Sequence, residues 1–190
     1  DILKQTLLQL AVMGKLVPQD PNDEPASELL KRIRNEKLEL GLAPHSKESK
    51  EITGRLKSSR HFSIPATWLW VKLSDLLIFG PRNGYSPKGV DRVTPVKSIT
   101  LGATSSGSFD PTKFKYVDES IESDSHLWLR EHDVLIQRGN SRDYVGIAAV
   151  YRGERDKFIY PDLMMKIRAS TLIDVEYLHI ALNCRSSRMH

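Results

Sequence analysis

The segment Asp133-Val134-Leu135-Ile136-Gln137-Arg138-Gly139-Asn140-Ser141-Arg142 joins an apolar run to a polar, basic end. Three consecutive branched apolar residues, 134–136, are typical of a buried β-strand. Gly139 and Asn140 favour a turn directly after that strand. The segment therefore predicts a strand over 133–138 that carries donor side chains into the loop at its end.

Similar apolar runs separated by turn residues continue through 63–190, which predicts a mixed α/β region. Further strands are expected over 69–79, 94–100, 113–117, 144–152 and 158–168, the last with a break at Pro161. A helix is expected after Asp174, with Val175, Leu178, Ala181 and Leu182 on its buried face. Antiparallel pairing of neighbouring strands is the expected arrangement.

Residues 1–42 have a helical pattern. Apolar residues recur at three- and four-residue spacing, first around Leu7 and again around Ile33, and a polar stretch with Pro18 and Pro21 separates the two runs. Two helices joined by a short turn predict an antiparallel hairpin, whose apolar stripe must meet another element. Residues 43–62 are rich in charge and lack a period, which predicts a linker.

Composition excludes several classes of protein. The 190 residues are 39% hydrophobic and 27% charged, which excludes wholesale disorder, and no apolar run is long enough for a spanning helix. The single cysteine, Cys184, cannot form an internal disulfide, so a cytoplasmic protein without a membrane partner is expected. A net charge of +4 is too small to predict a nucleic-acid partner by itself.

The sequence predicts neither a catalytic nor a metal site. It has no phosphate-binding glycine loop of Walker spacing and no zinc-ligand pattern. Pro161-Asp162 resembles the start of a Mg²⁺ nuclease motif, but methionine stands where a second carboxylate is required before Lys166. His126 and His132 lie near acidic residues, but no nucleophile accompanies them.

Donor side chains gather in the loops instead. Across 80–106 the basic residues Arg82, Lys88, Arg92 and Lys97 are opposed by Asp91 alone. Arginine and lysine neutralise phosphates, and Gln, Arg and Asn can bond base edges in pairs. The candidate DNA contacts are Arg82, Asn83, Tyr85, Lys88, Lys97, Ser105, Gln137, Arg138, Asn140 and Arg142. An ordinary polar turn remains the alternative interpretation of each loop.

The chain resembles the specificity subunits of type I restriction–modification systems. Residues 7–27 look like the helical segment near the start of such subunits, and 64–75 look like the beginning of a target-recognition domain. Residues 129–138 and 145–148 resemble the central strands of that domain. The resemblance covers essentially the whole chain.

The resemblance implies an α+β fold: a helical hairpin over 1–42, a linker over 43–62, and a target-recognition domain over 63–190 that is expected to stop short of its end. Such subunits read one half of a bipartite DNA target with each of two domains, so one half is expected here. They perform no chemistry; S-adenosylmethionine, ATP and Mg²⁺ are expected only in the modification and restriction subunits. The residues expected to bind partner subunits are Leu3, Leu7, Leu10, Leu30 and Ile33.

Two alternatives remain open from the residues. The chain could be an assembly scaffold for the methyltransferase subunits, with little DNA affinity of its own. An autonomous Mg²⁺ nuclease or methyltransferase is the third hypothesis, and the missing motifs count against it.

Overall fold

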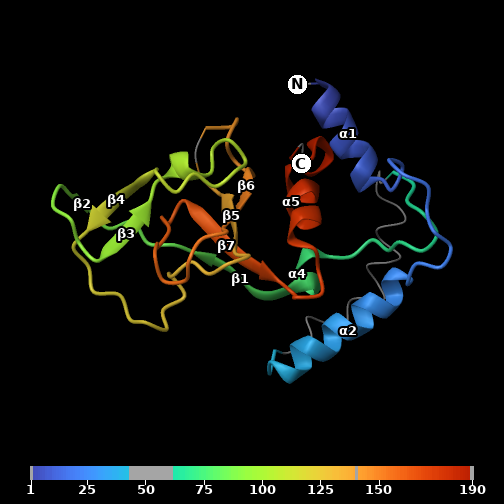
Figure 1. The fold of residues 1–190 in the computed structure, drawn as a ribbon, viewed down its shortest axis with the longest axis horizontal. Coiled ribbons are helices and arrows are strands. Elements are labelled where there is room, and N and C mark those ends of the chain that lie inside the picture. Colours follow the sequence, from blue (N-terminus) through green and yellow to red (C-terminus); the bar gives the residue numbers. More distant parts are fainter. Residues whose placement is uncertain (1, 43–61, 140, 189–190) are drawn as a thin grey trace. The chain divides into compact units, whose positions relative to one another are not determined.

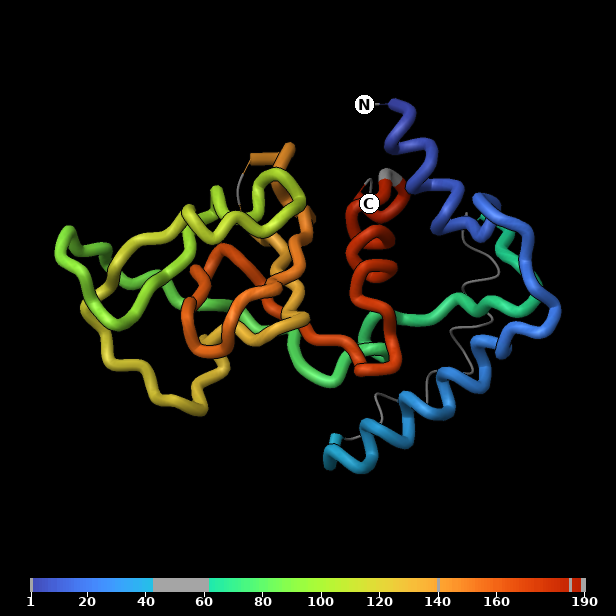
Figure 2. The backbone as a smooth tube through the Cα atoms, in the orientation of Figure 1, coloured from blue at the N-terminus to red at the C-terminus, as the bar shows by residue number. Residues whose placement is uncertain are grey.

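The computed structural model describes residues 2–42, 62–139 and 141–188, and they form two compact units (Figures 1 and 2). The helical unit comprises Asp1–Ile78 and Ala169–Ser186. The sheet unit comprises Phe79–Arg168 and Ser187–His190. The linker predicted over 43–62 lies outside the described residues except for Phe62.

The helical unit is built from α1 (Ile2–Val12), α2 (Ala26–Glu39), α4 (Leu73–Leu76) and α5 (Val175–Asn183). The expected helix after Asp174 is confirmed: the Asp174 carboxylate accepts hydrogen bonds from the backbone N–H groups of Glu176 and Tyr177 at 2.7 and 3.0 Å and caps α5. A short helix, α6 (Arg185–Arg188), follows.

The two N-terminal helices have different partners from those expected of a hairpin. α1 packs against α5, and α2 packs against α4. The expected hairpin rested on spacing within 1–42, whereas the contacts of these helices are made with segments far along the chain. Local periodicity reports that a face is buried but not what buries it.

Polar contacts bind α2 to two segments: the residues just before the first strand, near 74, and the residues just after the last strand, near 170. The Glu36 carboxylate accepts hydrogen bonds from the Ser170 hydroxyl and, at 2.9 Å, from the Thr171 hydroxyl. Partial burial opposes ionisation of Glu36, but the bonds from Ser170 and Thr171 outweigh it and lower the pKa of the carboxyl. Lys37 donates to the Ser74 carbonyl at 2.9 Å. Residues near 74 and 170 therefore belong with the helices, unlike the division expected at residue 63.

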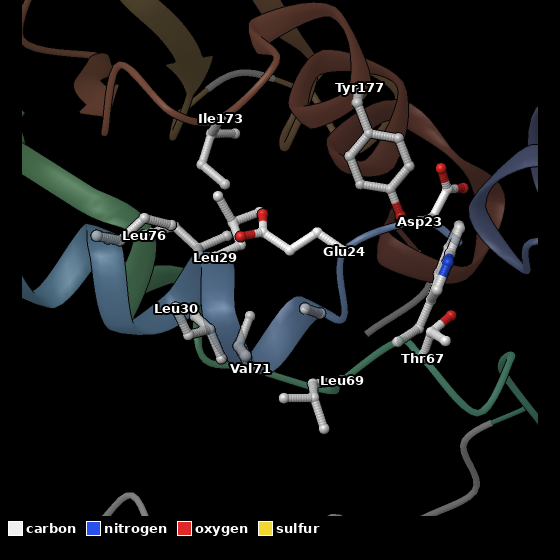
Figure 3. Close-up of a pocket in the computed structure, with 13 residues that line it drawn as sticks. Asp23, Glu24, Leu29, Leu30, Thr67, Leu69, Val71, Leu76, Ile173 and Tyr177 are labelled. Carbon is white, nitrogen blue, oxygen red and sulfur yellow. The ribbon is translucent and has the colours of Figure 1, made fainter. Parts of the chain in front are cut away.

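An apolar pocket of about 470 Å³ lies within the helical unit (Figure 3). Leu29 and Leu30 of α2 face Leu76 and Ile173 across it, and the Tyr177 ring stands at one end. Leu30 is half-buried here. The same face of α2 carries Ile33, considered next.

The expected partner-binding residues divide in two. Ile33 is 0% exposed, so its role as a partner contact is corrected: its side chain is enclosed by its own unit. On α1, Leu3 is 67% exposed and Leu7 is 44% exposed, while Leu10 is half-buried. Only the first part of α1 presents an apolar surface of the kind that a partner helix would cover.

The sheet unit contains two sheets. The four-stranded sheet has the order β1-β7-β5-β6 and the three-stranded sheet the order β2-β4-β3. The strands are β1 (Leu77–Asn83), β2 (Gly89–Val90), β3 (Val96–Ile99), β4 (Phe114–Val117), β5 (Val134–Gln137), β6 (Ala148–Val150) and β7 (Met164–Ala169). β5 pairs antiparallel with β6 and β7, and β4 with β2 and β3. The expected α+β class with antiparallel sheets is confirmed.

Residues 158–160 join the two sheets. The Ile99 amide donates to the Ile159 carbonyl at 3.0 Å, and the Ile159 amide donates to the Lys97 carbonyl at 2.9 Å. The main core of the unit lies beside this junction and contains Ile99, Ala103, Leu129, Leu135, Tyr151, Phe158, Tyr160 and Met164. The junction explains why the loops of both sheets are close to one another.

β1 differs from the strand expected over 69–79. Residues 73–76 are helical, and the strand runs from Leu77 to Asn83. Arg82 and Asn83 therefore belong to a strand and not to a free loop. β1 extends this far because β7 lies beside it in the sheet.

Candidate nucleic-acid interface

Two of the predicted donor-rich segments attach to one turn of the sheet unit. We call residues 84–89 the strap, 138–146 the β5 loop and 160–163 the β7 turn. The Tyr85 amide of the strap donates to the Tyr160 carbonyl at 2.9 Å. The Arg138 and Gly139 amides of the β5 loop donate to the Leu163 carbonyl at 2.9 and 3.3 Å. The fold thus joins the strap and the β5 loop, whose nearest residues are 49 positions apart in the sequence, into one surface.

Side chains hold the strap from further directions. The Ser86 hydroxyl donates to the Asp162 carboxylate at 2.5 Å and accepts from the Asp162 amide at 3.1 Å. Lys115 of β4 donates to the Pro87 carbonyl at 2.6 Å. The Tyr85 hydroxyl donates to the Glu119 carboxylate at 3.3 Å. The strap is therefore a positioned element, and Asp162 helps to position it.

A Gly84→Ala substitution is expected to lower the free energy of unfolding by about 1–3 kcal/mol, the usual cost of overpacking. A Cβ at residue 84 would lie 2.1 Å from the Tyr160 carbonyl oxygen, so the strap would have to move away from the β7 turn. Chemical denaturation measures the loss. Gly102→Ala is the matched control, because its Cβ would meet nothing closer than 3.6 Å. Equal stability of the two variants would contradict the close approach of the strap.

Several predicted contacts are exposed around this turn. Arg82, Asn83 and Lys88 are exposed on β1 and the strap, and Arg138 and Arg142 are exposed on the β5 loop. Tyr85 is 43% exposed despite its bond to Glu119. Asn140 lies outside the described residues. The exposed groups include four cations, which suit an anionic backbone.

Gln137 is corrected: it is 1% exposed and cannot reach a base edge in this structure. Its amide donates to the Leu101 carbonyl at 3.1 Å, the Thr104 hydroxyl at 3.0 Å and the Ser105 hydroxyl at 3.3 Å. The Ser105 hydroxyl donates in turn to the Leu101 carbonyl at 3.0 Å. Gln137 therefore ties β5 to the 3₁₀-helix η1 (Leu101–Ala103) and the residues that follow it.

Lys97 lies on β3, in the other sheet, and is half-buried. Its ammonium lies 4.9 Å from the ring centroid of Phe114 and 5.6 Å from that of Tyr116. These distances are within the range of cation–π attraction. No contact that we describe links Lys97 to the strap or the β5 loop through its side chain, so its predicted DNA role stays a prediction.

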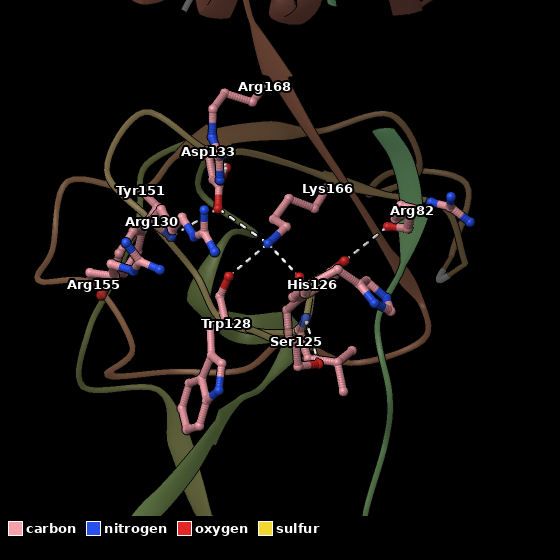
Figure 4. A network of polar contacts seen from close by, with 12 residues as sticks. Arg82, Ser125, His126, Trp128, Arg130, Asp133, Tyr151, Arg155, Lys166 and Arg168 are labelled. Carbon is pink, nitrogen blue, oxygen red and sulfur yellow. Dashed lines mark hydrogen bonds and ion pairs between the residues drawn. The ribbon is translucent and has the colours of Figure 1, made fainter. Parts of the chain in front are cut away.

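A buried ion-pair network lies behind this surface (Figure 4). The Lys166 ammonium lies 3.3 Å from the Asp133 carboxylate and donates to the His126 and Trp128 carbonyls at 2.5 and 2.7 Å. These three acceptors match the three hydrogens of an ammonium group. Arg168 pairs with the other Asp133 oxygen at 2.6 Å. Burial lowers the pKa of Lys166 against the opposing attraction of Asp133.

Two further contacts join residues beside the network to the end of β1. The imidazole Nε2 of His126, whose own carbonyl binds Lys166, lies 3.3 Å from the Asn83 carbonyl. The Tyr160 hydroxyl donates to the Arg82 carbonyl at 3.1 Å, and burial raises the pKa of this tyrosine. From the sequence, Asp133 was expected in a strand and beside two histidines, and Lys166 in a strand and in an incomplete nuclease motif, but no pairing of the two was expected. The signal that could have paired them is a lysine within the apolar run 163–167 and an aspartate directly before the apolar run 134–136.

Within the described residues no group of three or more His, Cys, Asp or Glu side chains is arranged to hold a metal ion. The helices of these same segments are all too short or too polar to cross a membrane.

The fold and this surface define a candidate DNA-binding protein of the α+β class. The chain is 32% identical to the type I restriction enzyme EcoEI specificity subunit of Escherichia coli over 189 residues, which cover 96% of this chain and 32% of that subunit. It is 52% identical to the EcoAI specificity subunit of the same organism over 88 residues, 46% of this chain and 15% of that subunit. No protein-family model matches the chain.

The chain is therefore similar over nearly its whole length to a type I restriction enzyme specificity subunit, as its resemblance implied. It spans about a third of the length of the EcoEI subunit that it matches.

Proposed function

We propose that this chain binds double-stranded DNA and reads one half of a bipartite target for a type I restriction–modification complex. The observation that carries this proposal is the junction of the strap and the β5 loop on the β7 turn. The strap carries the exposed Lys88 and follows the exposed Arg82 of β1, and the β5 loop carries the exposed Arg138 and Arg142, so this junction brings segments rich in cations together. The family supports the same role, since the two relatives are specificity subunits.

The side chains divide by chemistry into two roles. Lys88 lies on the strap and Arg82 on β1, and both segments are held by hydrogen bonds to the rest of the sheet unit. We assign these two side chains to phosphate contacts, which position a protein on DNA without reading its sequence. Arg138 follows the buried strand β5 directly, so its backbone is rigid and its guanidinium can make a bidentate contact with guanine. Arg142 lies further along the β5 loop and is assigned to a phosphate.

The chemistry of the complex is assigned to other subunits. We propose that this chain is not an enzyme and that modification subunits carry S-adenosylmethionine, while restriction subunits carry ATP and Mg²⁺. Recognition by this chain would then direct methylation and cleavage in the cytoplasm. The exposed apolar start of α1, with Leu3 and Leu7, is the surface that we assign to a modification subunit.

A salt titration of DNA binding tests the proposal. Each neutralised phosphate contributes about −0.9 to the slope of log affinity against log salt. Contacts from Arg82, Lys88 and Arg142 are therefore expected to give a slope on the order of −3. The measurement uses fluorescence anisotropy of a labelled duplex, with bovine serum albumin in place of the protein as the blank.

A flat salt dependence would contradict DNA binding and favour the second candidate function, an assembly scaffold for methyltransferase subunits. The observation that favours this candidate is the exposure of Ile2, Leu3 and Leu7 on α1, at 88%, 67% and 44%. A scaffold would bind a modification subunit equally well with and without DNA. Leu3→Asp is expected to abolish that binding.

A further inference from the structure

An apolar side chain, Leu163, stands exposed between the two donor-rich segments of the candidate interface. It is 42% exposed, although it lies in the β7 turn between buried Pro161 and buried Met164. Single exposed leucines are common on protein surfaces and need no explanation by themselves. The position of Leu163 differs because its backbone is fixed on both sides.

Five hydrogen bonds fix the backbone around Leu163. Its carbonyl accepts the hydrogen bonds from the Arg138 and Gly139 amides. Asp162, the preceding residue, is bound to the Ser86 hydroxyl of the strap. The Met164 amide donates to the Pro161 carbonyl at 3.0 Å and closes the turn. The backbone of Leu163 therefore has a defined place, bonded to Arg138 and Gly139 on the β5 loop and adjacent in sequence to the residue that holds the strap.

Gly139 gives the Leu163 side chain a supporting surface. A Cβ at residue 139 would lie 2.8 Å from Leu163 Cδ2, so the leucine packs directly against the glycine backbone. This contact limits the rotamers of Leu163 and leaves one part of its isobutyl group toward solvent. A side chain that is ordered before binding loses less entropy when it forms a contact.

The chemistry of the major groove leaves one partner for such a group. Base edges there present hydrogen-bond donors and acceptors, and the C5-methyl group of thymine is the apolar feature among them. An arginine that reads guanine would place the neighbouring base pair within reach of an adjacent aliphatic side chain. From this geometry we infer that Leu163 is a specificity-determining residue that contacts the thymine methyl group next to the base read by Arg138.

The inference rests on the proposed function, since it names one base contact of the same surface. The first step of its test is selection of duplexes from a random pool by the unmodified chain. Each thymine of the selected duplex is then replaced in turn by uracil, which removes only the methyl group. Loss of one buried methyl contact is expected to weaken binding about three- to five-fold at one position.

Leu163→Ala supplies the second half of the test. This variant is expected to bind the thymine duplex about three- to five-fold more weakly and to bind the uracil duplex as the unmodified chain does. Leu172→Ala is the matched control, because Leu172 is 39% exposed, a fraction similar to that of Leu163, and belongs to the helical unit and not to the sheet unit that carries the interface. The control is expected to keep the full response to uracil.

The outcomes separate the two claims. If the unmodified chain selects no sequence, DNA reading and this inference both fail. If it selects a sequence but no uracil replacement weakens binding, DNA reading stands and the role of Leu163 is overturned. The same conclusion follows if uracil weakens the binding of Leu163→Ala as much as that of the unmodified chain. The uracil series on the unmodified chain needs no variant, so poor folding of Leu163→Ala would not prevent a decision.

Discussion

Replacing Asp133 with asparagine is expected to lower the free energy of unfolding by about 3–5 kcal/mol, the usual cost of removing one partner of a buried ion pair. The Asp133 side chain is 0% exposed, and its two oxygens are shared by Lys166 and Arg168. One oxygen also accepts the Arg130 amide at 2.8 Å. Asparagine keeps the size of the side chain but leaves two cations without a counter-ion.

Urea denaturation of the variant and of the unmodified chain measures the effect. Glu131→Gln is the matched control, because it also neutralises a carboxylate two residues away, on a side chain that is 69% exposed. Exposed carboxylates contribute little, so this control is expected to change stability by less than about 1 kcal/mol. Similar losses in the two variants would contradict the central role of Asp133.

The destabilisation by Asp133→Asn is expected to ease as pH rises toward the ordinary lysine pKa. Burial already lowers the pKa of Lys166 in the folded state, and loss of Asp133 removes a charge that raises it. In the unfolded chain the pKa of Lys166 has the ordinary lysine value of 10.5. Between these two pKa values the unfolded state binds more protons, so the free energy of unfolding of the variant rises with pH. A variant whose deficit is constant from neutral pH to about 10 would show that Lys166 stays charged.

Arg138→Ala is the second substitution with a large expected effect, this time on DNA binding. It is expected to weaken binding to the selected duplex by about 1–3 kcal/mol and to relax base preference at one position. The reason is geometric: the Arg138 amide is bound to the Leu163 carbonyl, so the backbone directs the guanidinium from the end of β5. Binding to a scrambled duplex is expected to change little.

Lys88→Ala is the contrasting variant for this experiment. Lys88 is exposed on the strap, and a phosphate contact is expected to weaken selected and scrambled duplexes alike. The salt slope is expected to become shallower by about 1 in this variant. Equal losses on both duplexes from Arg138→Ala would show that Arg138 contacts phosphate and does not read a base.

Much of the local structure could be predicted from the sequence. The strand over 133–138, the helix after Asp174 and the strands near 96–99 and 114–117 rest on interactions between residues that are close along the chain. Apolar runs, turn residues and a capping carboxylate are visible in a single sequence for that reason. The family was accessible in the same way, because long stretches of its pattern are continuous.

The roles of individual polar residues could not be predicted. Gln137 has the right chemistry for a base contact, but three acceptors brought by residues 101–105 bind its amide. Ile33 has the right chemistry for a partner contact, but its own unit encloses it. In both cases the chemistry of the side chain suited the predicted role, but segments far along the chain bury the side chain and give it a structural role.

By itself, the sequence determined the element types, the absence of known catalytic motifs and the family. Only the tertiary structure decided which loops form one surface, because hydrogen bonds such as Tyr85 to Tyr160 and Arg138 to Leu163 join residues that are far apart in the chain. The tertiary structure also paired Asp133 with Lys166, since a buried charge must find its counter-ion wherever the fold places it.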